Sequence, residues 1–144
     1  MVAYASNVEL MIDYGAFVPV RAHDTDAGLD LRSPVKTVIP AHGSVCIDTG
    51  IHMALPTGTF GKLESKSGLH VKHDIVCLGG VIDSSYRGSI VVKLYNMGDE
   101  SYEIERGDKI VQLIIQPCML PAMLLVNELD KTERGENGFG SSGR

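Results

Sequence analysis

Short apolar segments alternate with turn residues along most of the chain. The segments are 8–12, 35–39, 44–48, 51–55, 60–64, 89–95, 101–105, 109–115 and 123–126. Their β-branched residues favour strands, and turn sequences such as 40–43 and 106–108 separate them. Many short strands at close spacing are typical of an antiparallel sandwich or barrel. The pattern therefore predicts an all-β fold.

One segment departs from the strand pattern. Residues 67–73 predict a single short helix, which needs packing against the rest of the protein to be stable. Ser65 or Ser67 is expected to cap its N-terminus, because a serine oxygen accepts hydrogen bonds from the first unpaired N–H groups of a helix.

Composition narrows the class of protein. A chain of 144 residues fits one domain, and its net charge of −5 argues against a nucleic-acid surface, which needs a basic stripe. A small anionic ligand remains possible. No segment approaches the ~20 apolar residues that span a bilayer, so we expect no membrane contact. Cys46, Cys77 and Cys118 lack metal-site spacing and are expected to be reduced core residues of a cytoplasmic protein.

Polar residues interrupt the apolar pattern at two places in the first half of the chain. Asp26 and Asp30 flank an Ala-Gly step, and Asp30 lies between leucines in an expected strand. Each carboxylate is either a local turn cap or, for Asp30, a contact to metal-bound water beside an anionic ligand. Ser67 and Gly68 begin the expected helix after Lys66, which suits an anion site, although simple capping explains the serine equally well.

Two further interruptions follow in the second half. Residues 78–88 place Asp83 at the end of an expected strand, after glycines and before Tyr86 and Arg87. Glycines at a hairpin tip can present backbone groups to a nucleobase, and Tyr86 can pack against a sugar. The alternative is a surface turn in which Asp83 pairs with Arg87. Gln112 lies in an otherwise apolar strand, and its amide either satisfies a neighbouring backbone or reaches a ligand.

The C-terminal residues 134–144 cannot form a core element. Their glycines, together with Arg134 and Phe139, suit either a flexible solvated tail or a lid that closes over a ligand. In a lid, the Arg134 guanidinium group can donate two parallel hydrogen bonds to phosphate oxygens, and the flat Phe139 ring can stack on a base.

Taken in order, five of these segments resemble the five sequence motifs of the trimeric dUTP pyrophosphatases (dUTPases). The segments are 27–30, 65–68, 80–88, 107–112 and 134–143. They extend from residue 27 to residue 143, so the resemblance covers nearly the whole chain. Any one motif is weakly specific, whereas five in this order are highly specific.

The resemblance implies a jelly-roll-like β-barrel, or β-clip, and a homotrimer with active sites at subunit interfaces. It further implies Mg²⁺-assisted hydrolysis of dUTP to dUMP and pyrophosphate. Such an enzyme limits uracil incorporation into DNA and supplies dUMP for dTMP synthesis. One barrel domain is then expected over residues 1–130, followed by a flexible glycine-rich lid over residues 131–144.

The resemblance also implies roles for individual residues. Asp83 is the expected general base that activates water, and Asp30 the expected contact to Mg²⁺ through water. The residues expected to bind the base and sugar are Gly80, Val81, Ile82, Tyr86 and Phe139. The residues expected to bind the phosphates are Lys66, Ser67, Gly68, Gln112, Arg134, Gly140, Ser141 and Ser142.

Three positions depart from the family pattern. Lys66 stands where arginine is usual, which replaces a planar fork by a point charge and weakens the expected phosphate contact or makes it indirect. Ser65 replaces a common proline, and Ser85 replaces a frequent acidic residue. Two alternatives remain open: a dCTP deaminase-like enzyme of the same superfamily, and a nucleotide-responsive interaction protein.

Overall fold

The computed structural model describes residues 7–138, which form strands and one short helix. The elements are β1 (Glu9–Ile12), β2 (Gly28–Arg32), β3 (Thr37–Ile39), β4 (Ser44–Asp48), β5 (Ile51–Ala54), β6 (Thr59–Ser65), α1 (Ser67–His73), β7 (Ile75–Cys77), β8 (Val81–Asp83), β9 (Val91–Asn96), β10 (Tyr102–Ile104) and β11 (Lys109–Pro117). The all-β class with one short helix is therefore confirmed.

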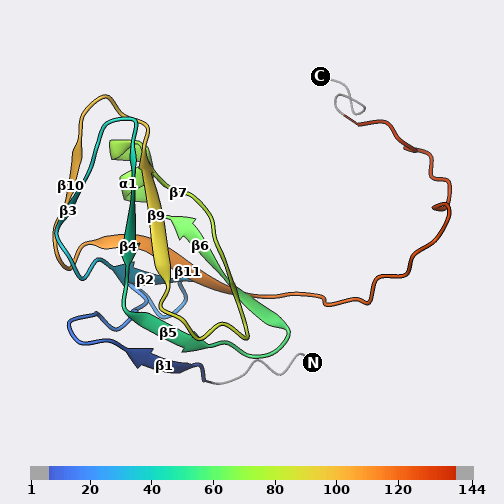
Figure 1. Ribbon diagram of the computed structural model, residues 1–144, viewed down its shortest axis with the longest axis horizontal. Coiled ribbons are helices and arrows are strands. Elements are labelled where there is room, and N and C mark those ends of the chain that lie inside the picture. Colours follow the sequence, from blue (N-terminus) through green and yellow to red (C-terminus); the bar gives the residue numbers. More distant parts are fainter. Residues whose placement is uncertain (1–6, 139–144) are drawn as a thin grey trace.

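Antiparallel pairing organises these strands into two larger sheets and two smaller pairs. The four-stranded sheet has the order β2-β11-β6-β8, and the three-stranded sheet has the order β4-β9-β7. The smaller pairs are β1-β5 and β10-β3. Figure 1 shows the strands gathered into one jelly-roll-like β-barrel, with β1 and β5 along its lower edge.

The core forms where the strands turn alternate side chains inward. Along β9, Val92 and Leu94 are buried, while the alternate residues Val91 and Lys93 are exposed. Leu31 and Leu113 from the four-stranded sheet are likewise fully buried and join the same hydrophobic cluster. Both larger sheets therefore share one core.

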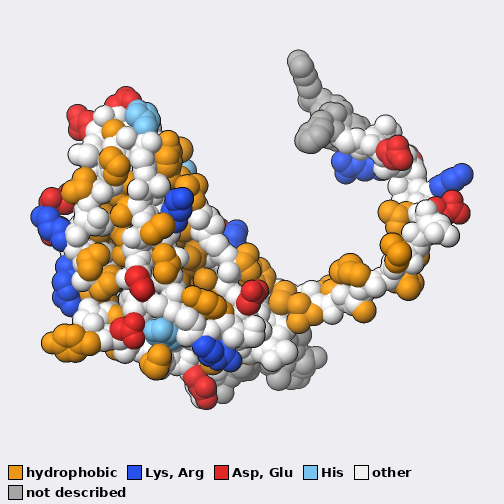
Figure 2. All heavy atoms as spheres, viewed as in Figure 1, with side chains coloured by type: hydrophobic (Ala, Val, Ile, Leu, Met, Phe, Trp, Pro, Cys, Tyr) orange, Lys and Arg blue, Asp and Glu red, His pale blue; other side chains and the backbone are white. Residues whose placement is uncertain are grey.

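The strand predicted over 123–126 is wrong. β11 ends at Pro117, and residues 118–138 contain no helix or strand. Figure 1 shows this segment leaving the barrel as an extended arm, and Figure 2 shows apolar side chains along it. Leu124 is 84% exposed and Leu125 is 97% exposed. A strand needs a neighbour for its backbone groups, and the described chain offers none to the arm.

The helix lies where the sequence predicts it, but its cap differs. Lys66 occupies the N-cap position without a side-chain capping bond, so a serine cap is wrong. The Ser65 hydroxyl instead accepts a hydrogen bond of 2.9 Å from the Cys77 backbone N–H and so ties β6 to β7. The sequence pattern missed β7, which has only three residues. No helix within residues 7–138 is long and apolar enough to cross a membrane.

The three cysteines are free, as expected, but they are not all core residues. Cys46 is exposed on β4, so its assignment to the core is wrong. Cys77 is half-buried, and burial raises the pKa of its thiol to about 11. Its sulfur donates to the Gly79 carbonyl at 2.8 Å.

Neighbouring valines on β9 offer a matched test of this packing. Val92→Ala, at a fully buried site, should lower the free energy of unfolding by about 2 kcal/mol, because two buried methyl groups are lost and a cavity remains. Val91→Ala, at a site 49% exposed, should cost clearly less. Urea unfolding at one fixed protein concentration measures both; equal losses would contradict the described inside and outside of β9.

Candidate active site

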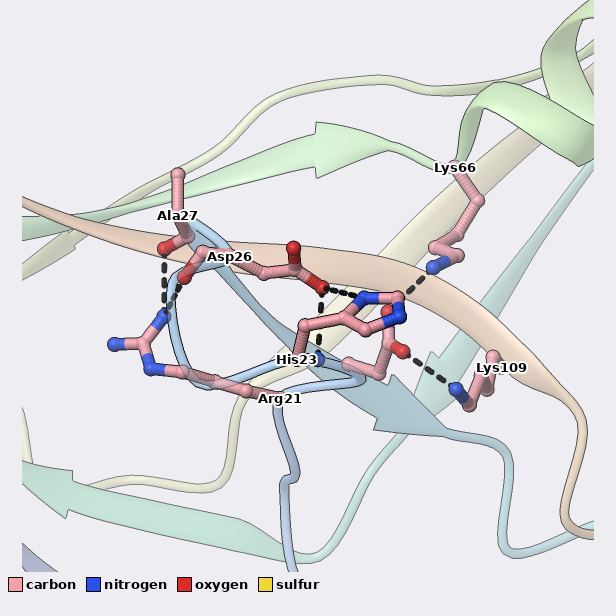
Figure 3. A network of polar contacts seen from close by, with 7 residues as sticks. Arg21, His23, Asp26, Ala27, Lys66 and Lys109 are labelled. Carbon is pink, nitrogen blue, oxygen red and sulfur yellow. Dashed lines mark hydrogen bonds and ion pairs between the residues drawn. The ribbon is translucent and has the colours of Figure 1, made fainter.

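The most buried charged group in the four-stranded sheet is the carboxylate of Asp30 on β2. Its side chain is 5% exposed, and Lys66 Nζ and Lys109 Nζ lie 2.5 and 2.8 Å from its two oxygens. In Figure 3 the side chains of Lys66 and Lys109 point into the same space, and a dashed line runs from each ammonium group to its ion-pair partner. Burial raises the pKa of Asp30, but the hydrogen bonds from Lys109 and Lys66 outweigh it and hold that pKa below its usual value.

Strand register brings Gln112 next to this group. On β11, Gln112 lies opposite Asp30 of β2 on one side and Glu64 of β6 on the other. Its amide Nε2 donates to the Ser65 carbonyl at 3.1 Å. Of the two roles expected for Gln112, a contact to a neighbouring backbone or to a ligand, the structure therefore has the backbone contact. A Cβ atom at Gly28 would lie 2.9 Å from Gln112 Cβ, which explains the glycine there. Asp30, Lys66, Lys109 and Gln112 are called the lysine cluster below.

The first residues of α1 continue from this cluster. Ser67 and Gly68 are exposed and follow directly after Lys66. Their backbone N–H groups belong to the first turn of the helix, where no intrahelical acceptor is available. Lys66 itself points to Asp30.

Asp26 has the local role that the alternative interpretation gives it. Its carboxylate accepts a hydrogen bond of 3.0 Å from the His23 backbone N–H and lies 3.1 Å from His23 Nδ1. Arg21 donates to the Asp26 and Ala27 carbonyls at 2.5 and 2.9 Å, which closes the same turn (Figure 3). These contacts shape the chain just before β2.

A second group of predicted site residues forms β8 and a hairpin-like turn after it. The predicted β-hairpin with glycines at its tip is wrong, because in the described part of the chain β8 pairs only with β6 and no strand returns alongside it. Residues 80–88, called the Asp83 hairpin below, border a cavity of about 200 Å³. The cavity is lined by Val81, Ile82, Asp83, Tyr86, Ser89 and Val91. Asp83 is exposed at the end of β8, and its carboxylate has no hydrogen-bond or ion-pair partner among residues 7–138.

Hydrogen bonds within the hairpin fix its shape. Tyr86 N–H donates to the Asp83 carbonyl at 3.0 Å, and the Tyr86 hydroxyl donates to the Ser89 carbonyl at 3.1 Å. Arg87 Nη1 donates to the Ser84 and Tyr86 carbonyls at 2.7 and 2.9 Å. Arg87 therefore holds the loop backbone and does not form the surface pair with Asp83.

Within one chain, Asp83 lies away from the lysine cluster, although the other end of the hairpin is nearer, since Leu63 N–H donates to the Gly80 carbonyl at 3.0 Å. Asp83 pairs with Phe60 near the start of β6, whereas Ser65, next to the cluster, ends the same strand. At about 3.3 Å per residue, residues 60 and 65 are roughly 17 Å apart along β6. Asp83 is thus separated from the phosphate-side residues by most of the length of β6.

The predicted lid residues lie in or beyond the arm. Arg134 Nε donates to the Asn137 carbonyl at 3.0 Å, a contact within the arm itself. Phe139, Gly140, Ser141 and Ser142 lie outside the described residues.

Residues 7–138 do not contain enough grouped metal-ligating side chains to hold a metal ion by protein ligands alone. No group of three or more His, Cys, Asp or Glu side chains there could hold an ion. Each Asp30 oxygen accepts one ammonium group and keeps a lone pair for a water. This set fits a cation bound mainly by ligand oxygens and water, with Asp30 as an outer contact.

Lys109 is the site residue that sequence reasoning missed. It lies in segment 107–112, which resembles one of the five family motifs, but the resemblance implies no role for this lysine. Its position two residues after Gly107, at the start of a strand that pairs with β2, was the available signal.

Comparison with known proteins places the chain in one family. The dUTPase family model matches residues 15–143. The deoxyuridine 5'-triphosphate nucleotidohydrolase of Paramecium bursaria Chlorella virus 1 is 43% identical over 128 residues, which cover 89% of this chain and 91% of the relative.

Solved structures agree with the family match. The dUTPase of Staphylococcus bacteriophage 80alpha with dUPNHPP has a TM-score of 0.90 at 31% identity and covers 97% of this chain and 100% of that one. A mutant dUTPase from phage phi11 of S. aureus, described with a structural Mg(II) ion, has a TM-score of 0.79 at 28% identity, with coverage of 85% and 97%. The chain belongs to the dUTPase family.

Proposed function

We propose that the protein hydrolyses dUTP to dUMP and pyrophosphate by attack of water on the α-phosphorus. This reaction limits uracil incorporation into DNA and supplies dUMP for dTMP synthesis. Within a chain of the dUTPase family, the observation that carries the proposal is the Asp83 carboxylate, which has no partner in residues 7–138 and borders a cavity with Tyr86. A carboxylate in that position can orient the water and accept its proton.

The hairpin and its cavity provide the proposed specificity. Backbone groups of Gly80, Val81 and Ile82 pair with the uracil edge, and the tight hairpin leaves no room for the methyl group of thymine. Cytosine exchanges a donor for an acceptor and would leave buried groups unpaired, which such a site discriminates strongly. Tyr86 packs under the deoxyribose and excludes a 2′-hydroxyl, and Phe139 stacks on the base.

The lysine cluster and the start of α1 provide the proposed phosphate side. Ser67 and Gly68 donate to phosphate oxygens from the first helical turn, and Gln112 and Arg134 add side-chain donors. Lys66 acts indirectly, because its ammonium group is held by Asp30 and adds positive charge behind Ser67. Gly140, Ser141 and Ser142 wrap the γ-phosphate with backbone and hydroxyl donors.

Mg²⁺ is the proposed cofactor. Phosphate oxygens and water hold it, with Asp30 as an outer contact, and when bound it neutralises charge that builds up on the leaving pyrophosphate. The residues of the chain then position the substrate, which is most of what phosphoryl transfer requires from a protein.

Asp83 and the lysine cluster lie at opposite ends of β6 within one chain. A homotrimer with active sites between subunits would bring these two parts together from different chains. In this arrangement the Asp83 hairpin of one copy faces the lysine cluster of another. The apolar arm supports the assembly, since Leu124 and Leu125 have no packing partner in the described part of their own chain. The arm also carries residues 131–138 away from the barrel (Figure 1). Residues 131–144 then act as the lid over the site of a neighbour.

Free cysteines are consistent with a reducing compartment, and we propose a cytoplasmic location. The family match does not favour the deaminase alternative.

Side-by-side assays of pyrophosphate release from dUTP, dTTP, dCTP and UTP test this function directly. We expect dUTP to be hydrolysed at least about 100-fold more efficiently than the others, because a mismatched base edge leaves buried polar groups unpaired. Ammonia release from dCTP would instead identify a deaminase.

Replacement of Asp83 tests the general base. Asp83→Asn should lower kcat for dUTP by about 100-fold or more with little change in dUTP binding, because a neutral amide cannot accept the proton. Single-turnover rates and calorimetric titration measure the two effects. Asp99→Asn, an exposed carboxylate paired with His42, is the control and should keep full activity. Near-normal turnover in Asp83→Asn would remove this residue from the mechanism.

Removal of the lid tests the role of the C-terminal residues. A chain truncated after Lys131 should remain a folded trimer but hydrolyse dUTP poorly, because it lacks Arg134, Phe139 and the glycine-rich segment. Light scattering reports the assembly and pyrophosphate release reports the activity. Unchanged activity in the truncated chain would show that residues 132–144 are a solvated tail and not a lid.

A further inference from the structure

His52 joins the Asp83 hairpin to the N-terminal part of the barrel. It lies on β5, opposite Met11 of β1, and its side chain is 18% exposed. Its Nδ1 lies 2.8 Å from the Arg87 carbonyl oxygen, and its Nε2 lies 3.3 Å from the carboxylate of Asp13. The imidazole therefore bridges the returning arm of the hairpin and the residue that follows β1.

Both atoms that face the ring are acceptors. A backbone carbonyl and an ionised carboxylate can only accept hydrogen bonds, and a neutral imidazole carries a single N–H. Neutral His52 must therefore turn a lone pair toward either the Arg87 carbonyl or Asp13. The imidazolium ion has two N–H groups and satisfies both partners at once.

The surrounding charges favour the imidazolium ion. The hydrogen bond to the Arg87 carbonyl and the hydrogen bond to Asp13 raise the pKa of His52, and the carboxylate of Asp48 adds to this against the opposing effect of burial. Glu9 and Arg87 line a cavity of about 320 Å³ together with His52. The Arg87 guanidinium opposes protonation, but it is engaged with the Ser84 and Tyr86 carbonyls, and the nearby carboxylates are more numerous.

The Arg87 carbonyl is a sensitive point of the hairpin. The outgoing arm is held by the pairing of β8 with β6. The returning arm is held further on, where the Ser89 hydroxyl bonds to Asp48 and Ile90 N–H donates to the Ile51 carbonyl at 2.9 Å. Between these anchors, no donor other than His52 reaches the Arg87 carbonyl within residues 7–138.

We propose that protonated His52 is a positioning residue for the Asp83 hairpin, which it holds in its active shape by donating to the Arg87 carbonyl and to Asp13 at the same time. This inference rests on the proposed dUTP hydrolysis, in which Asp83 and Tyr86 are carried by the hairpin. It adds a residue that touches neither substrate nor reacting atoms and acts through the loop backbone.

The direction of the pH dependence follows from the sign of the shift. Because the pKa of His52 is raised in the folded protein, its stabilising contribution is complete below the ordinary pKa of about 6.5 and is lost as the pH rises through the higher folded value. Above that pH the two acceptors compete for one proton, so the hairpin loosens. Turnover should therefore fall on the alkaline side of the His52 titration.

Three variants and one control test this role in the full-length protein. His52→Ala removes both contacts and should lower kcat for dUTP about three- to tenfold at pH 7, with a smaller change in KM, because the general base is displaced. His52→Gln keeps a neutral donor and should recover most of the turnover without the alkaline fall. Asp13→Asn should weaken the alkaline fall, because the amide N–H can donate to a neutral ring whose own N–H stays on the Arg87 carbonyl. His42→Gln, which changes the exposed pair of His42 with Asp99, should leave the profile unchanged.

A titration without substrate separates this inference from the proposed reaction. The ring C–H resonance of His52, followed by NMR in histidine-labelled protein without nucleotide, should titrate above 6.5 and move down in Asp13→Asn. A His52 pKa at or below 6.5, full turnover in His52→Ala, or an unchanged alkaline fall in His52→Gln would each overturn the role. Failure of the unaltered protein to hydrolyse dUTP would instead refute the proposed function and leave the titration interpretable.

Discussion

The pairing of β11 with two neighbours is the constraint on which the rest of this structure depends. Its register with β2 and β6 sets Gln112 opposite both Asp30 and Glu64, which lie far apart in the sequence. Alternate residues of the same strand, Val111 and Leu113, are fully buried in the core. A single strand therefore holds the barrel together with one face and assembles the polar cluster with the other, so a register slip would destroy both at once.

Much of the fold could be predicted because burial in a sheet leaves a local signature. The alternation along β9 and the turn residues between strands are visible without neighbours. The predictions failed where a contact with a neighbouring segment determines the local structure. Residues 123–126 have the composition of a strand but no partner in the described chain, and three-residue β7 is a strand because β9 lies beside it. Ser65 was available as a cap, yet β7 offered its hydroxyl a donor.

For the site, residue types and order along the chain indicated the family, while the contacts required the fold. An aspartate between leucines suggests a special role, but two lysines from separate elements satisfy Asp30 only after β2, β6 and β11 are aligned. The hairpin residues were recognisable from their glycines and Tyr86. Their distance from the lysine cluster was not, because it depends on where β8 pairs along β6.

That distance along β6 has a genetic consequence. In the proposed trimer, each chain gives its hairpin to one site and its lysine cluster to another. A chain defective only in the hairpin and a chain defective only in the cluster damage different halves, so some sites in a mixed assembly combine two intact halves. Two alleles that are each inactive alone can therefore complement one another, whereas two defects in the same half cannot.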